Sequence, residues 1–275
     1  QYVIRDLDSS LVGSEMCIRD RYILVNIPAF RLEAVDGGQV TRRHRVIVGK
    51  PDRQTPTLNV KIRGVNFFPY WRVPESIARR DLIPRLKRDP EYLKREHIRV
   101  ARGSYDGTEI KSNKINWRNV SSSSIIFRQD PGPWNALGLV RINMPNKDIV
   151  YLHDTPLQSL FKQHRRAFSA GCVRVQNVMG LVSWITKDER VPIDPDDIEK
   201  IVDGTDPADL RKKRPKKLDV QLSRPVPVQF VYVTAWGQAD GKIHFRSDIY
   251  GRDGAGSRTR VTNVASSPFV NALSP

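Results

Sequence analysis

Two residues of this sequence could together perform nucleophilic chemistry: His153 and Cys172. Cys172 lies in the stretch SAGCVRV, and the chain has one other cysteine, Cys17. A thiol becomes a nucleophile when a nearby base takes its proton or a positive environment lowers its pKa. A lone cysteine is also often a small buried hydrophobe, so these residue types alone leave a catalytic thiol and inert packing about equally open.

The elements expected around these two residues would allow them to meet. His153 ends an apolar run at residues 149–153 that is typical of a strand, and a side chain at a strand end can project into a cleft. Cys172 follows a long loop and precedes an amphipathic helix, whose apolar face is formed by Val178, Leu181, Val182 and Ile185. We therefore expect the imidazole and the thiol to lie in one cleft.

The composition narrows the partners but not the chemistry. The net charge is +16 and the pI about 10.1, which favours an anionic partner: nucleic acid, an acidic membrane leaflet or an acidic polymer. No run of about 18 apolar residues occurs, so we expect no transmembrane segment in this chain. The other histidines match no metal-ligand spacing, and we expect neither a metal nor a cofactor.

The first residues need separate treatment. The stretch SSLVGSEMCIRDR, residues 9–21, resembles a translated sequencing adapter. We expect residues 1–21 to be an artefactual or disordered leader and Cys17 to be accidental. Cys172 would then have no internal disulfide partner.

Strand patterns dominate the chain from Tyr22 onward. YILVNIPAFRLEAV and DGGQVTRRHRVIVG alternate apolar and polar residues on either side of Asp36, which predicts two strands joined by a tight hairpin. Residues 74–124 read as an insertion with short helices that restart at Pro84 and Pro90, followed by a polar loop, SNKINWRNVSSSS. Further strands are expected at residues 125–129 and 139–143.

The C-terminal part continues with mixed elements. DPDDIEKIVDG has an acidic start and a terminal glycine, which favour a helix, and DPADLRKKRPKKLD is a basic linker. VQFVYVTAW and KIHFRSDIY flank GQADG and predict a second hairpin. Residues 254–275 form a tail with little periodicity.

The motifs HDTP and SAGCVRV together resemble the active-site signature of the L,D-transpeptidases with a YkuD-like catalytic domain. That signature is a histidine, a spacer and then S-H-G-C-[IV]-R. The stretches NIPAFRLEAV, RVIVGKPDRQTP, PYWRVPESIAR, RQDPGPWNALG, MPNK and TAWGQADGKIHFRSDIYGRD resemble the larger Gram-negative murein members with a substrate-capping insertion. The resemblance covers about residues 22–253.

The resemblance implies a mainly β fold with α insertions. It would be a YkuD-like β-sandwich at residues 22–253, with a helical capping insertion at 74–124 and a C-terminal β-hairpin extension. It also implies acyl transfer in peptidoglycan, an export signal or wall-binding module upstream of residue 1, and a periplasmic location.

The implied chemistry assigns roles to residues around the motif. His153 would deprotonate Cys172, whose thiolate attacks a tetrapeptide donor at its third residue and expels D-alanine. A diamino-acid amine of another stem peptide then accepts the acyl group from the thioester, giving a 3→3 crosslink. Backbone N–H groups near Gly171 and Cys172 would form the oxyanion hole. Carbapenem β-lactams would be covalent inhibitors.

One position departs from the family pattern. Ala170 stands where the family has a second histidine. The resemblance implies that the residue at this position orients the catalytic imidazole mainly through its backbone carbonyl, and Ala170 retains a carbonyl. We expect activity to be kept; if the side chain of the family histidine contributes substantially to proton handling or substrate contact, the protein would instead be slow or inactive.

Four further residues are expected to bind substrate: Arg174, Ser169, Tyr70 and Trp71. Arg174 would hold a substrate carboxylate or tie down loop carbonyls, and both readings stay open. Tyr70 and Trp71 would border the cleft under the insertion or pack in the core. Asp154 is expected to shape its loop rather than to join the chemistry.

Several alternatives remain open. Water as acceptor would make the protein an L,D-carboxypeptidase, and an outer-membrane lipoprotein would make it an attachment enzyme. SLFK, residues 159–162, matches the S-x-x-K motif of serine D,D-transpeptidases, but the companion K-T-G and S-D-N elements are absent, so we interpret it as coincidence. A basic wall-binding or nucleic-acid-binding protein is a more distant alternative; no base-reading motif occurs, and we expect no nucleic acid as partner.

Overall fold

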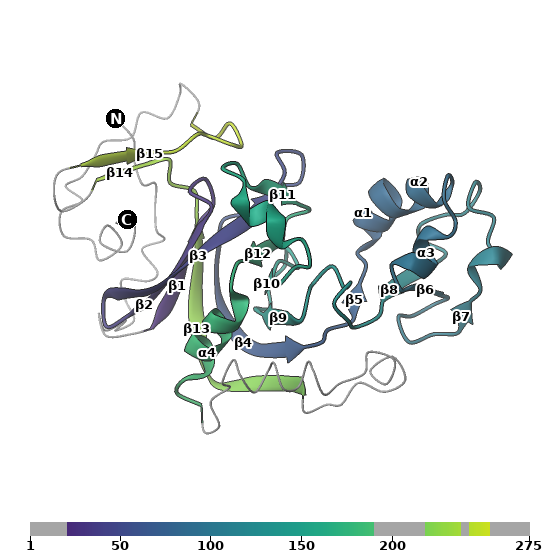
Figure 1. Cartoon of the computed structure of the whole chain (residues 1–275), viewed down its shortest axis with the longest axis horizontal. Coiled ribbons are helices and arrows are strands. Elements are labelled where there is room, and N and C mark those ends of the chain that lie inside the picture. The colour runs from purple at the N-terminus through teal and green to yellow at the C-terminus, as the bar shows by residue number, and fades with distance from the viewer. Residues whose placement is uncertain (1–20, 190–217, 238–241, 254–275) are drawn as a thin grey trace.

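The computed structural model of the protein describes residues 21–189, 218–237 and 242–253 (Figure 1). Four expectations therefore lie wholly or largely outside the described residues: the leader with Cys17, the helix in DPDDIEKIVDG, the basic linker and the tail. Within the described residues, no helix is long and apolar enough to cross a bilayer.

A nine-stranded sheet forms the main body. Its strand order is β11-β3-β12-β10-β9-β4-β13-β1-β2, and an additional β2–β3 pairing curls the sheet back on itself. The main apolar cluster lies inside this curled sheet and is completed by helix α4 (Val178–Thr186). The strands are β1 (Tyr22–Asn26), β2 (Arg31–Asp36), β3 (Gln39–Gly49), β4 (Leu58–Phe67), β9 (Val140–Asn143), β10 (Leu152–His153), β11 (Ala167–Ser169), β12 (Val173–Val175) and β13 (Asp219–Val231).

The hairpin expected at Asp36 is confirmed between β2 and β3, with Gly37 and Gly38 at φ angles of 57° and 78°. The single strand expected before it is wrong, because residues 22–35 form β1 and β2 with a turn between them. Ile27 and Phe30 of that turn are buried in the core. Because residues of this turn are apolar, the sequence contains no polar stretch that would mark the end of one strand and the start of the next.

The boundary of the fold lies earlier than expected. Arg21, which we had placed in the leader, donates hydrogen bonds to the carbonyls of Trp184 and Ile185 at 3.1 and 2.8 Å. Its guanidinium also lies 4.7 Å from the Trp184 ring centroid and 2.7 Å from the Asp188 carboxylate. Arg21 is therefore part of the packed structure and closes the end of α4.

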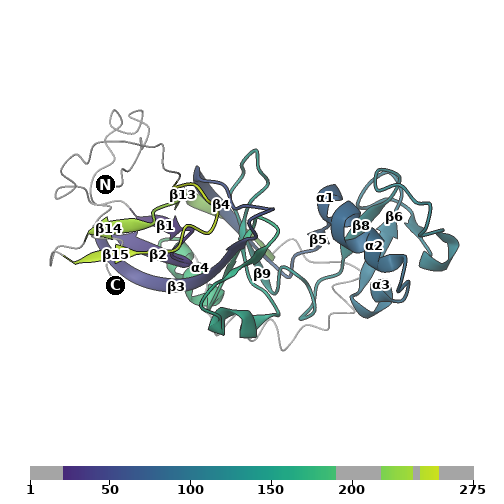
Figure 2. The ribbon, with the colours of Figure 1, turned by 90° about the horizontal axis from the view of Figure 1, so that it is seen from above.

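The insertion forms a separate lobe with its own small core, beside the main sheet (Figures 1 and 2). The helices expected near the two prolines are present, but the lobe also contains a sheet in the order β5-β8-β6-β7, which the sequence analysis missed in part. Its elements are β5 (Trp71–Arg72), α1 (Glu75–Ile77), a π-helical turn (Ala78–Leu82), α2 (Ile83–Leu86), α3 (Tyr92–Arg95), β6 (Ile98–Ala101), β7 (Glu109–Ile110), a 3-10 turn (Ser112–Lys114) and β8 (Ile126–Gln129).

The polar stretch SNKINWRNVSSSS contributes to this second core. Trp117 is 6% exposed and packs against Phe127, with ring centroids 6.1 Å apart. One large apolar side chain thus anchors a segment whose composition otherwise indicates a loop.

The expected C-terminal hairpin is present in a shorter form. β14 (Ala235–Gly237) pairs with β15 (Ile243–Phe245), whereas VQFV belongs to the long strand β13 between β4 and β1. A 3-10 helix at Gln158–Lys162 occupies part of the loop between β10 and β11.

Asn135 ties the insertion to the main body. Its side-chain amide donates to the carbonyls of Pro69 and Asp130, at 3.1 and 2.9 Å, and its Oδ1 accepts from the Leu137 N–H at 2.8 Å. Pro69 precedes the insertion and Asp130 follows it, so one fully buried side chain joins the chain where it leaves the sheet and where it returns.

Replacing Asn135 by Ala should therefore be costly. The change leaves two buried carbonyls and one N–H unpaired, and we expect the free energy of unfolding to fall by about 2–4 kcal/mol in urea titrations. Asn59→Ala, the same truncation at an exposed position of β4, should change it by less than about 0.5 kcal/mol. Equal effects of the two changes would contradict the junction role.

Candidate active site

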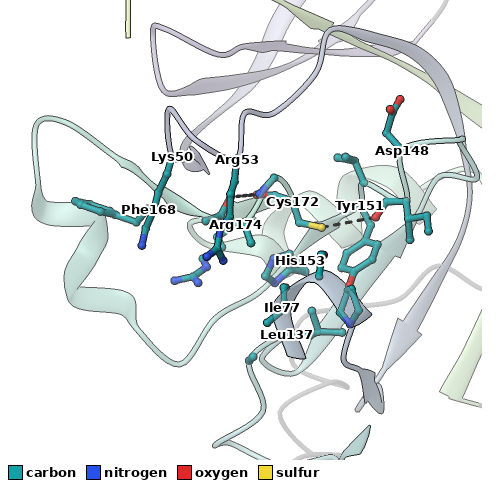
Figure 3. Close-up of a pocket in the computed structure, with 18 of the residues that line it drawn as sticks. Lys50, Arg53, Ile77, Leu137, Asp148, Tyr151, His153, Phe168, Cys172 and Arg174 are labelled. Atoms are coloured by element: carbon teal, nitrogen blue, oxygen red, sulfur yellow. Dashed lines mark hydrogen bonds between the residues drawn. The ribbon is translucent and has the colours of Figure 1, made fainter. Parts of the chain in front are cut away.

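A cavity of about 570 Å³ collects most of the predicted site residues. Cys172, His153 and Arg174 line it, together with Trp71, Ser169, Ala170 and Gly171. Figure 3 shows the Cys172 thiol and the His153 imidazole facing the same space, with Tyr151 on one side and Arg174 on the other. Tyr70 is not among the lining residues; the guanidinium of Arg128 lies 4.6 Å from its ring centroid instead.

His153 is held rigidly and in its neutral form. It ends β10, which is paired with both β9 and β12, and it is 4% exposed. Its Nδ1 lies 2.5 Å from the Asp154 carbonyl oxygen. This contact fits an Nδ1–H donor and leaves Nε2 as a proton acceptor. Burial and the nearby Arg174 cation lower the pKa of His153 to about 3, so the ring is a free base at neutral pH.

The acceptor for His153 differs from the expected one. Ala170 was predicted to orient the imidazole through its carbonyl, but the hydrogen bond that the structure gives to His153 goes to Asp154. The Ala170 residue is exposed and lines the cavity. The sequence motif predicted that the acceptor for the imidazole would lie in residues 169–172, which we call the nucleophile loop. The structure instead provides the carbonyl of Asp154, the residue that directly follows His153.

Cys172 is a protonated thiol in its resting state. It is half-buried, and its Sγ lies 3.8 Å from the carbonyl oxygen of Ile149, a weak S–H hydrogen bond. Burial raises the pKa of the Cys172 thiol, and the hydrogen bonds from Tyr151 and the positive charges of Arg174 and Arg141 offset this only in part. The Cys172 and His153 side chains therefore rest as a neutral pair rather than as a thiolate and an imidazolium.

The Ser169 side chain holds the backbone of the nucleophile loop through two hydrogen bonds within the loop. Ser169 is buried, and its hydroxyl donates to the Cys172 carbonyl at 2.5 Å and accepts from the Gly171 N–H at 3.1 Å. Ser169 thus holds the loop and also lines the cavity, and its binding of substrate stays a prediction. The Gly171 N–H, expected in the oxyanion hole, is already used. Among the described residues, the Cys172 N–H donates to no acceptor and remains available to an oxyanion.

A second brace comes from Thr55. Its buried hydroxyl donates to the Gly171 carbonyl at 2.8 Å and accepts from the Gly49 N–H at 2.9 Å. Tyr250 supports this loop in turn, because its hydroxyl donates to the Gly49 carbonyl at 2.7 Å and accepts from the Thr55 N–H at 3.1 Å. The C-terminal segment therefore reaches the nucleophile through two hydrogen-bonded layers.

Arg174 lines the cavity with an incompletely paired guanidinium. It lies on β12, two residues after Cys172, and its buried Nε has no hydrogen-bond partner in the described part of the chain. Burial lowers the pKa of Arg174, but an arginine still carries its charge at neutral pH. The position fits the prediction that Arg174 holds a substrate carboxylate.

Tyr151 is a site residue that the sequence analysis missed. Its ring meets the His153 imidazole edge to face, with centroids 5.8 Å apart, and its hydroxyl interacts with Cys172 and Trp71. Burial raises the pKa of Tyr151 well above its usual range, so it stays protonated. The sequence did offer an indication: Tyr151 precedes His153 by two residues, and residues two apart lie on the same face of a strand.

The loop before β10 carries backbone strain. Ile149 is 71% exposed and has a φ of 55°, a conformation that is unfavourable for a β-branched residue. Asn146 enforces it: the Nδ2 donates to the Met144 and Val150 carbonyls, and the Oδ1 accepts from the Asp148 and Val150 N–H groups. The strained loop presents the carbonyl that receives the thiol.

Asp154 shapes its loop, as predicted. Its carboxylate accepts hydrogen bonds from the Leu139 N–H at 3.0 Å and from the Gln158 side chain at 3.1 Å. Ser159 and Lys162 of the S-x-x-K match do not line the active-site cavity.

Comparison with known proteins identifies the family. A model of the YkuD family, the L,D-transpeptidase catalytic domain, matches residues 20–193. This chain belongs to that family. The match includes both His153 and Cys172, whereas the Tyr250 segment lies beyond it.

The chain is also similar to individual proteins. A curated Haemophilus influenzae protein named "Putative L,D-transpeptidase" is 33% identical over 236 residues, which are 84% of this chain and 44% of that protein. This chain therefore spans less than half the length of that relative. The solved L,D-transpeptidase from Mycobacterium smegmatis shares 14% identity over 76% of this chain and 58% of its own, with a TM-score of 0.33. The LD transpeptidase LdtMt1 in complex with imipenem shares 14% identity over 77% of this chain and 58% of its own, also with a TM-score of 0.33.

The neutral resting pair predicts a characteristic pH dependence. In a Cys17→Ser background, alkylation of Cys172 by iodoacetamide should rise about tenfold per pH unit up to at least pH 9, because the thiol pKa is raised above its ordinary value. The rate should show no step near pH 6.5, since His153 is already neutral there. A plateau between pH 6 and 8 would instead reveal a preformed thiolate–imidazolium pair.

Removing the Thr55 hydroxyl should loosen the nucleophile loop. Thr55→Val keeps the shape of the side chain but leaves the Gly171 carbonyl and the Gly49 N–H unpaired, and we expect acylation of Cys172 by a carbapenem to slow about tenfold or more. The matched control is Thr57→Val, at an exposed position two residues away. If both variants acylate at the wild-type rate, the brace does not position the thiol.

Proposed function

We propose that this protein is a cysteine-dependent L,D-transpeptidase of peptidoglycan that forms 3→3 crosslinks. The observation that carries the proposal is the Cys172 thiol and the neutral His153 imidazole lining one cavity. The family supports the reaction class, since L,D-transpeptidases act on peptidoglycan and are inhibited by carbapenems.

The first half-reaction begins with proton transfer. The Cys172 Sγ turns from the Ile149 carbonyl toward the His153 Nε2, which takes the thiol proton as the sulfur attacks the carbonyl of the third stem-peptide residue. The bond from that carbonyl carbon to the nitrogen of the terminal D-alanine breaks, and the imidazolium returns the proton to the leaving amine. A thioester and free D-alanine result.

Burial determines the timing of this step. A thiolate–imidazolium pair is costly in a desolvated site, so the pair ionises as charge passes to the substrate rather than beforehand. The Asp154 carbonyl stabilises the imidazolium through its contact with Nδ1. The Cys172 N–H stabilises the oxyanion, and Arg174 holds a carboxylate of the donor peptide.

The second half-reaction transfers the acyl group. The side-chain amine of a diamino acid in a neighbouring stem attacks the thioester, forms the amide bond and returns the thiol. Water in place of the amine would give L,D-carboxypeptidase products, and a lipoprotein amine would give attachment. Crosslinking requires the protein to work outside the cytoplasmic membrane, and we place it in the periplasm.

Intact-protein mass spectrometry after incubation with a carbapenem tests the nucleophile. We expect a one-to-one covalent adduct with the chain and with Cys17→Ser, and none with Cys172→Ala. An adduct that persists in Cys172→Ala, or a folded protein without any adduct, would contradict the proposal.

Muropeptide analysis tests the acceptor. With disaccharide tetrapeptide as substrate, we expect 3→3 crosslinked dimers and free D-alanine. A product mixture of tripeptides without dimers would establish the carboxypeptidase instead. Ala170→His, which restores the family residue, should raise turnover without changing the products.

A further inference from the structure

A second cavity, larger than the active site, lies on the β2–β3 side of the main body. Its volume is about 910 Å³, and it is bordered by the β2–β3 strands, the loop at residues 162–166 and the segment at residues 246–249. Its lining is strongly basic. We call it the cationic cavity and define it by Arg45, Lys162, Arg165, Arg166 and Arg246.

These five side chains have no carboxylate partner in the described part of the chain. Arg166 donates to the carbonyls of Phe30, Val46, Gln163 and His164, and Arg246 to that of Phe245. These carbonyl oxygens accept hydrogen bonds from the guanidinium N–H groups but do not neutralise the positive charge of the arginines. Two other lining arginines, Arg31 and Arg43, are paired with the buried Glu33.

The cavity stores like-charge repulsion. Burial and the neighbouring Arg45 lower the pKa of Arg166 to about 10. One acidic residue, Asp248, also lines the cavity; it keeps its negative charge and accepts a hydrogen bond from the Tyr232 hydroxyl, so the five defining cations outnumber it. An anion entering here would gain the attraction of several guanidinium groups at once.

An unpaired histidine gives a second, independent indication of a ligand. His44 lines the cavity, is 6% exposed and places its Nδ1 2.9 Å from the Gln176 carbonyl oxygen. Its Nε2 is buried without a hydrogen-bond partner among the described residues. Because Nδ1 faces a carbonyl and burial lowers the pKa of His44, Nδ1 donates and Nε2 is left as an acceptor. Buried polar atoms are nearly always paired, so this acceptor favours a ligand that brings an N–H or O–H group beside its carboxylates, as a peptidoglycan chain does.

A chain of shared lining residues relates the cationic cavity to the active site. Gln163, His164 and Arg165 line both it and a smaller hollow, and that hollow shares Lys50 and Phe168 with the active-site cavity. In Figure 3, Lys50 and Phe168 lie together on the side of Cys172 opposite to Tyr151. A long substrate could therefore occupy both cavities.

We propose that the cationic cavity binds the carboxylates of the peptidoglycan chain next to the stem peptide that is acylated at Cys172. This inference rests on the proposed function. Stem peptides carry several carboxylates at intervals along a polymer, which matches separate basic side chains spread over a large cavity. The site would raise the affinity for the polymer while contributing nothing to the chemistry of a short peptide.

The test compares two variants with equal loss of charge. The first replaces Arg45, Lys162 and Arg165, which are exposed, by Gln, and the control replaces Arg63, Arg118 and Lys61, exposed residues outside the cationic cavity, by Gln. In cosedimentation with murein sacculi at low salt, we expect the first variant to bind about tenfold more weakly and the control to stay within about twofold of wild type.

Two further probes identify the bound group. Sacculi whose carboxylates have been converted to amides should bind the wild type as weakly as intact sacculi bind the first variant. Equal losses in the two variants, or unchanged binding to amidated sacculi, would overturn the proposal. Binding of duplex DNA or of inorganic phosphate can be measured with the same two variants. If the first variant and the control differ in binding either of these ligands but not in binding sacculi, the proposal is overturned as well.

Kinetics separate this inference from the proposed function. In the first variant, KM for polymeric murein should rise about tenfold, whereas kcat and the rate of acylation by a carbapenem should stay within about twofold of wild type. If wild type forms no acyl-enzyme at all, the proposed function fails, and sacculus binding still decides whether the cavity recognises carboxylates.

Discussion

The hydroxyl of Thr55 joins three parts of the chain that would otherwise be independent. It links the end of β3 at Gly49, the loop at residues 50–55 and the nucleophile loop at Gly171. Tyr250 adds a fourth part from the C-terminal segment. Gly171 has a φ of 123°, which a residue with a side chain would rarely adopt, so the thiol stands on a backbone that needs such external support.

Electrostatics then decide what state the braced thiol adopts. Burial keeps both Cys172 and His153 uncharged, while the unpaired Nε of Arg174 leaves positive potential in the cavity. The site is thus prepared for negative charge that arrives with the substrate or develops during the reaction. Tyr151, protonated and packed edge to face against the imidazole, forms one wall of the same cavity.

Sequence patterns predicted the parts of the site that depend on residue type and missed those that depend on backbone geometry. Cys172, His153 and Arg174 were predicted to belong to the site because their residue types and spacing match the motif. The hydrogen bonds of Ser169 and Gly171, and the contact of His153 with the Asp154 carbonyl, were not predicted, because the hydrogen bonds of a tight loop are decided by dihedral angles. Tyr70 and Trp71 are adjacent in the chain, and only the strand β5 determines which of them faces the cavity. The turn after β1 is apolar, and for this reason β1 and β2 were predicted as a single strand.

The contact between the loop at residues 50–55 and the insertion has a mechanical consequence. Arg53 pairs with Asp81, and Arg80 with Asp52, between this loop and the insertion, while Asn135 fixes the insertion at its base. Exposed ion pairs contribute only about 0.2–1 kcal/mol each and weaken with salt. The loop at residues 50–55 is therefore held to the insertion by contacts that weaken as ionic strength rises, whereas the neutral hydrogen bonds of Asn135 depend little on salt.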